Sequence, residues 1–190
     1  FRVFPGFAHY PGAMTTPPFA PVSARDFEVM AAQLGRPMRD VVGVAARCVC
    51  GNPLVVSTLP RLSDGTPFPT FYYLTHPGAT AAMSELEATQ VMVQFSEDLA
   101  NDPQLRDDYL AAHEAFLADR NGFGEVAEIE GISAGGMPTR VKCLHALAGH
   151  ALAAGPGVNP IGDRALELAR PRWSADVCRC ADPGADLTSR

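Results

Sequence analysis

"VVGVAARCVCGNPLVVSTLP", residues 41 to 60, is the stretch on which the fold prediction depends. It contains two runs rich in β-branched residues, separated by Gly51-Asn52-Pro53, a combination typical of a turn between strands. A third run, "TFYYLTHP", follows the turn sequence "LSDGTPFP". These three runs predict a small antiparallel sheet.

Helices are expected before and after these three strands along the chain. "SARDFEVMAAQLGRP" begins with a good N-cap, Ser23, carries apolar residues at helical spacing, and ends at Gly35 and Pro37. After the third strand, the pattern predicts helices over residues 78–100, 103–122, 138–155 and the stretch 159–171. We therefore predict an α+β fold, in which a three-stranded antiparallel sheet packs against four to five helices gathered on one side.

Length and composition indicate one domain. The 190 residues are 47% apolar, enough for a single core, and we expect a flexible lead over 1–22, an α+β domain over 23–170 and a cysteine-containing tail over 171–190. Met14 is a plausible start of the chain, and the N-terminal segment lacks the pattern of a secretory signal. No apolar run reaches about 18 residues, so no membrane span is expected. The net charge of −6 argues against broad nucleic-acid binding.

The cysteines suggest a metal site. Cys48 and Cys50 form one C-x-C pair, and Cys178 and Cys180 form another. Residues two apart on a strand face the same side, so each pair can present two sulfurs, and four sulfurs complete the tetrahedral set that Zn²⁺ prefers. The prediction requires the tail to return to the sheet. An iron–sulfur cluster, or buried thiols without a metal, are the alternatives. Without an export signal we expect reduced thiols and a cytoplasmic protein.

A glycine loop precedes the helix expected from Pro138. Its glycines and the start of a helix would offer backbone amides to a phosphate or carboxylate, and nearby side chains would add donors and positive charge. The predicted anion-binding residues are Ser133, Gly135, Gly136, Thr139, Arg140 and Lys142. The alternative is that the glycines only allow the chain to turn and that the cations point to water.

Cys143 is a candidate nucleophile, because Arg140 and Lys142 would favour its thiolate, and His145, His150 or His76 could act as base. On a continuous helix, however, Cys143 and His145 face different directions, and Cys143 and His150 lie roughly 10 Å apart along the axis. This helix alone is therefore not expected to bind a metal. Packing is the alternative role for Cys143.

Three ordered blocks, "RCVCGNPLVV", "DGTPFPTFYYLTHP" and "SAGGMPTRVKCLHALAGHALAAGPGVNPIGD", resemble the bacterial domain-of-unknown-function 501 family over about Gln33 to Leu168. The family has no established activity, and its members are often encoded near a septum-formation initiator and an exopolyphosphatase. Many relatives have no cysteine where Cys50 stands. The resemblance thus implies a shared set of Cys48, Cys143 and histidines, as a mixed metal site or a reactive thiol pocket.

Two classes of function follow. The first is a zinc-stabilised binding module that recognises a small anionic ligand or a protein partner. The second is a small enzyme that acts on a phosphorylated or carboxylated metabolite through Cys143 or a metal-bound water. It predicts one pocket lined by Arg47, Cys48, His76, Arg140, Cys143 and His145.

Overall fold

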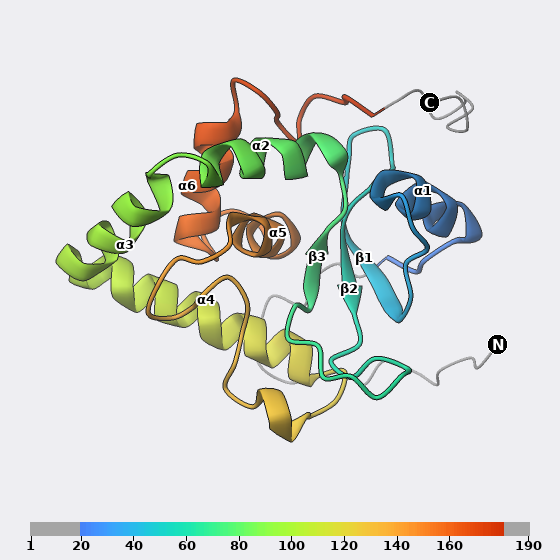
Figure 1. Cartoon of the computed structure of the whole chain (residues 1–190), viewed down its shortest axis with the longest axis horizontal. Coiled ribbons are helices and arrows are strands. Elements are labelled where there is room, and N and C mark those ends of the chain that lie inside the picture. Colours follow the sequence, from blue (N-terminus) through green and yellow to red (C-terminus); the bar gives the residue numbers. More distant parts are fainter. Residues whose placement is uncertain (1–19, 181–190) are drawn as a thin grey trace.

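A computed structural model describes residues 20–180 (Figure 1). Its sheet contains the three predicted strands, β1 (Val41–Arg47), β2 (Pro53–Thr58) and β3 (Tyr72–Leu74), in the order β1-β2-β3 with both pairs antiparallel. Ala20 forms an isolated bridge with Val44, so the described chain begins at the sheet. The predicted α+β class is confirmed.

Both faces of the sheet are covered by helices. Neighbouring residues of β2 point to opposite faces, and every residue of this strand is buried. Val55 belongs to the main core, whereas Val56 packs with Met30 of α1 (Ala24–Leu34) in a smaller cluster. The expectation that all helices lie on one side is wrong, because an apolar residue on each face of β2 requires cover on each side. Figure 1 shows α1 on the opposite side from α5.

The α5 helix (Leu144–Ala154) is the centre of the larger layer. It packs against the sheet, α2 (Pro77–Glu87) and α6 (Pro160–Ala169). A Cβ on Gly162 would lie 2.8 Å from the Ala151 Cβ, so glycine allows α6 to approach α5 closely. Leu144 and Leu147 of α5 are fully buried.

The helix predicted over 78–100 is divided into α2 and α3 (Val91–Asn101). At the break, the Thr89 hydroxyl donates to the Leu86 carbonyl and accepts from the Val91 amide. This local bonding offers the backbone an alternative to a continued helix. The chain then turns at Asp102, whose side chain accepts from the Leu105 amide at the start of α4 (Pro103–Asn121).

The connection between α4 and α5, residues 122–143, contains a short 3₁₀ turn, Ala127–Ile129. Arg120 of α4 is buried and donates to the carbonyls of Ile129 and Ile132, which fixes this connection. The helix that was expected to begin at Pro138 begins at Leu144 instead. None of the helices in residues 20–180 combines the length and the apolar character that crossing a bilayer requires.

Candidate metal centre and adjoining pocket

The turn between β1 and β2 presents two cysteines. The Cys48 amide donates to the Asn52 carbonyl at 2.8 Å, and the Gly51 amide donates to the Cys48 carbonyl at 2.7 Å. Gly51 has φ +90°, a conformation that glycine adopts without strain and that lets the chain reverse within the turn. Cys48 is buried, and Cys50 is half-buried.

The C-terminal segment returns to this turn, as the prediction required. Trp173, 3% exposed, anchors the segment beside the start of α2, where its ring lies 5.6 Å from that of His76. A Cβ on Gly78 would lie 2.8 Å from Trp173 Cδ1, so the tryptophan fits against a glycine. Six residues then separate Trp173 from Cys180.

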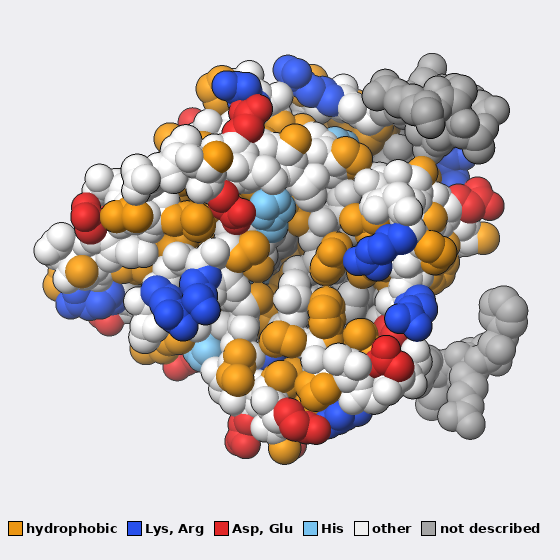
Figure 2. All heavy atoms as spheres, in the orientation of Figure 1, with side chains coloured by type: hydrophobic (Ala, Val, Ile, Leu, Met, Phe, Trp, Pro, Cys, Tyr) orange, Lys and Arg blue, Asp and Glu red, His pale blue; other side chains and the backbone are white. Residues whose placement is uncertain are grey.

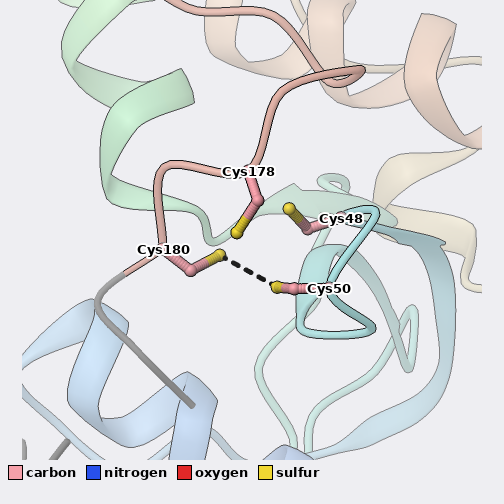
Figure 3. Close-up of side chains that lie close together, drawn as sticks. All are labelled: Cys48, Cys50, Cys178 and Cys180. Carbon is pink, nitrogen blue, oxygen red and sulfur yellow. Dashed lines mark hydrogen bonds between the residues drawn. The ribbon is translucent and has the colours of Figure 1, made fainter.

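The four sulfurs of Cys48, Cys50, Cys178 and Cys180 form a thiolate cluster, in which all the sulfurs lie within 4.8 Å of one another (Figure 3). The Cys50 and Cys180 sulfurs are 3.5 Å apart. A disulfide requires about 2.05 Å. Tetrahedral zinc with Zn–S bonds of about 2.3 Å separates its sulfurs by roughly 3.8 Å. This cluster could hold a metal ion.

Crowding and burial oppose four negative charges at this position. Burial raises the pKa of Cys48 and that of Cys180, and neighbouring sulfurs contribute to both shifts. Burial would also raise the pKa of Cys50, but the Asn52 amide and the neighbouring thiols lower it overall. A bound cation would remove this conflict by neutralising the thiolates together.

Hydrogen-bond donors surround the sulfurs. The amides of Cys50 and Asn52 donate to the sulfurs of Cys48 and Cys50, respectively. His76 is the N-cap of α2: its Nδ1 accepts from the Gly78 amide at 3.1 Å, so its Nε2 carries the proton. That Nε2 lies 3.2 Å from the Cys180 sulfur. Burial lowers the pKa of His76, which keeps the ring neutral. The predicted catalytic candidate His76 thus lies at the thiolate cluster, where it orients a sulfur.

Arg47 connects the turn to α1. Its guanidinium donates to both carboxylate oxygens of Asp26, at 2.7 and 3.0 Å, and to the Gly51 carbonyl at 2.8 Å. Ser23 and Asp26 also form the capping box that begins α1. The hydrogen bond from Arg47, with those from Ser23, holds the pKa of Asp26 at about 2 despite its burial.

A separate pocket of about 760 Å³ lies between the sheet and the connection that precedes α5. Figure 2 shows this face of the molecule hollowed between the helices and the sheet, with basic side chains beside the hollow. The lining includes every predicted anion-binding residue, namely Ser133, Gly135, Gly136, Thr139, Arg140 and Lys142, and also Cys143 and His145.

The two glycines of this loop serve the packing of the protein itself. A Cβ on Gly135 would lie 2.5 Å from Leu147 Cδ2, and one on Gly136 would lie 2.6 Å from the Arg140 carbonyl oxygen. Their carbonyls accept from the amides of Arg140 and Lys142. The amides of Arg140 and Lys142, which were expected to be open to an anion, are therefore used within the loop.

The polar side chains of the pocket differ in burial and in whether they have a partner within the protein. The Ser133 hydroxyl is buried and lies 2.8 Å from His113 Nδ1. Arg140 and Lys142 are exposed, and neither side chain has an ion pair within residues 20–180. Among the described residues of the pocket, the two cations are therefore available to a ligand, as is the exposed Thr139.

Cys143 and His145 meet at the pocket wall, together with a residue that sequence reasoning missed. Cys143 is the extended N-cap of α5, so its sulfur lies 4.0 Å from His145 Nδ1. Glu87, at the end of α2, accepts from the Leu144 amide at 2.6 Å and lies 3.0 Å from the same His145 nitrogen. The Cys143 sulfur and the Glu87 carboxylate raise the pKa of His145 to about 9 against the effect of burial. No local signal connects Glu87 with His145, 58 residues later.

The remaining candidate, His150, is a core residue. Its ring is fully buried, stacks on Tyr72 at 5.4 Å and has its Nδ1 3.2 Å from Asn159 Nδ2. Burial lowers its pKa to about 4. His150 lies outside the lining of the pocket.

The expectation of one shared constellation is wrong. Cys48 belongs to the thiolate cluster and His76 contacts it, whereas Cys143 belongs to a second group with His145 and Glu87. The pocket lining likewise contains Arg140, Cys143 and His145 but not Arg47, Cys48 or His76. The β1–β2 turn and the start of α5 thus carry two separate groups of side chains that could hold a metal ion.

The fold and the side-chain clusters define a small α+β protein that combines four cysteines that could hold a metal ion with a separate pocket lined by both apolar and charged side chains. Residues 44–167 match the family described as "Protein of unknown function (DUF501)", and the chain belongs to that family. The match includes Glu87, Cys143 and His145 and ends before Cys178. Comparisons with curated proteins and with solved structures gave no match.

Proposed function

We propose that this protein is a zinc-stabilised binding module. The observation that carries the proposal is the convergence of two cysteine pairs, 130 residues apart from Cys50 to Cys180, with all four sulfurs within 4.8 Å. Four thiolates without an open position are typical of a structural zinc site. The amide donors and the His76 N–H further support a site with negatively charged sulfurs.

In this function the zinc fastens the C-terminal segment to the β1–β2 turn. Free thiols at all five cysteines are consistent with a reducing compartment such as the cytoplasm. The zinc contributes to stability and does not react, because protein sulfurs occupy its whole coordination shell.

The test is the metal content of protein purified without added metal. We expect the parent to contain zinc and Cys178→Ser to lose about one equivalent. Val177→Ser changes an exposed neighbour in the same segment and should keep the parent's zinc. Metal-free parent protein, or equal zinc in Cys178→Ser and the parent, would refute the proposal. A parent protein that is brown and contains iron would show that the four cysteines hold an iron–sulfur cluster instead of zinc.

The ligand of the module is proposed to be a small anion. The pocket of about 760 Å³ supports this, since Arg140 and Lys142 line it and have no ion-pair partner among the described residues. Binding would use these two side chains rather than the loop amides. A protein partner that presents a carboxylate or phosphate would be held by the same chemistry.

Calorimetry with inorganic phosphate tests the anion site. Replacing both cations, as Arg140→Gln with Lys142→Gln, should weaken binding at least about tenfold, because two charge-assisted contacts are lost. The control is Arg170→Gln, since Arg170 lies on the surface beside Glu167 and outside the pocket. Equal affinity in the double variant and the control would eliminate these cations as the anion site.

A second candidate function is an enzyme that acts on a phosphorylated or carboxylated metabolite. It is favoured by the position of Cys143, which lines the pocket with its sulfur 4.0 Å from His145 Nδ1. Cys143→Ser should then abolish turnover while the melting temperature stays unchanged. Full turnover in this variant would exclude Cys143 as the reactive group.

A further inference from the structure

Outside the thiolate cluster, residues 20–180 contain a second group of side chains able to hold a metal ion: Glu87, Cys143 and His145. One ligand atom from each, an oxygen, a sulfur and a nitrogen, lies within 4.8 Å of the other two. All three residues are half-buried, and Cys143 and His145 line the pocket. The group lies between the end of α2 and the beginning of α5.

The contacts of the His145 ring determine which nitrogen is available. Nε2 lies 3.1 Å from the Thr80 carbonyl oxygen, which can only accept, so Nε2 carries a proton and donates it. Nδ1 is then the nitrogen that can coordinate. A ligating histidine usually donates its other N–H to a carbonyl or carboxylate, and the contact with Thr80 is of this kind.

The same ring argues against an acid–base triad. In a triad, the carboxylate holds one ring nitrogen and the nucleophile uses the other. Here Glu87 Oε1, at 3.0 Å, and the Cys143 sulfur, at 4.0 Å, both approach Nδ1. The oxygen, the sulfur and this nitrogen therefore lie close together, as the ligands of a single metal ion do.

The backbone makes this arrangement possible. Cys143 has φ −149° and ψ 108°, an extended conformation, whereas Leu144 is the first residue of α5. The sulfur therefore does not follow the helical rotation that would turn it away from His145. Glu87 is held in place by the Leu144 amide at 2.6 Å, which orients its carboxylate.

We propose that Glu87, Cys143 and His145 form a second metal site, which binds Zn²⁺ through three protein ligands and leaves its fourth position open to the pocket. Mixed nitrogen, sulfur and oxygen ligands suit zinc, and three ligands with an open position are typical of catalytic rather than structural sites. The open position accepts an oxygen of a phosphate- or carboxylate-bearing ligand. Arg140 and Lys142, in the lining of the same pocket, neutralise the remaining charge of that ligand. This site uses no residue of the thiolate cluster, so it does not rest on the structural zinc.

Cobalt substitution separates the two sites. We expect parent protein to bind about two Co²⁺, one with intense sulfur-to-cobalt absorption from four thiolates and one with weaker absorption from a single thiolate. Glu87→Gln should lose about one equivalent, with the intense absorption retained, because the amide replaces an anionic ligand but still accepts from the Leu144 amide. Glu85→Gln, an exposed neighbour on α2, should bind as the parent does. In the parent, inorganic phosphate should change only the weaker spectrum.

Alkylation of parent protein provides a measurement without any variant. Zinc should slow the reaction of Cys143 with iodoacetamide about tenfold or more, and a chelator should restore the rate. Mass spectrometry of the peptide that contains Cys143 measures this rate. Equal cobalt content in Glu87→Gln and the parent, together with unchanged Cys143 alkylation, would overturn the second site and favour a metal-free thiol. Loss of all cobalt in Cys178→Ser would also overturn it, while the structural zinc would stand. A parent without metal would refute both.

Discussion

Asp26 illustrates how one buried carboxylate supports the candidate metal centre. It begins α1, and its contact with Arg47 holds the guanidinium that also bonds to the Gly51 carbonyl in the cysteine turn. Its pKa is about 2 in the folded protein, below the ordinary value of 3.8. The ionised carboxylate is therefore the form that stabilises the fold. Its contribution to the free energy of unfolding is complete above about pH 4 and is lost as the pH falls from about 4 to 2.

We predict that Asp26→Asn lowers the free energy of unfolding by about 1–2 kcal/mol at pH 7, and that the difference from the parent shrinks below pH 4. Urea unfolding at several pH values measures this. Glu28→Gln, an exposed change on the same helix, is the control and should leave stability unchanged. A constant difference between Asp26→Asn and the parent down to pH 2 would contradict the role given to its charge.

At the scale of elements, the connection that leads into α5 depends on two left-handed glycines rather than on a ligand. We predict that Gly136→Ala destabilises the protein by about 2 kcal/mol or more, because φ is +95° and the new methyl group would meet the Arg140 carbonyl at 2.6 Å. Thermal or urea unfolding provides the measurement.

Gly131→Ala is the matched control for this loop. Its φ is also positive, at +65°, but no atom lies within 4 Å of the added Cβ, so we expect a smaller loss of about 1 kcal/mol from backbone strain alone. Equal losses in the two variants would mean that the close contact at Gly136 does not matter.

For the whole molecule, the thiolate cluster lies at the margin of the main core, because Cys50 and Cys180 are only partly buried and pack against it. The core around α5 contains Phe71, Tyr72, Phe116 and Leu147, all fully buried, and only Cys48 of the thiolate cluster is among its buried members. We predict that a chelator lowers the melting temperature but leaves the domain folded, while the segment after Trp173 becomes accessible to trypsin at Arg179. Circular dichroism and mass spectrometry of the digest measure the two effects.

Cys178→Ser should show the same cleavage at Arg179 without a chelator, and Val177→Ser should not. Complete unfolding on removal of zinc would show instead that the centre is part of the cooperative core. Protection of Arg179 in metal-free protein would show that the anchor at Trp173 suffices to hold the segment.

The sequence by itself determined the strands, most helices and the requirement that two C-x-C pairs meet, because turn residues, caps and apolar spacing are local signals. It misplaced the helices on one side of the sheet, and it extended the helix of Cys143 back to Pro138. Only the tertiary structure decided that α1 covers the second face, that Cys143 is an extended cap, and that Glu87 reaches His145. These outcomes depend on which distant surfaces exclude water together and on which side chains satisfy the ends of helices, and no local pattern encodes either.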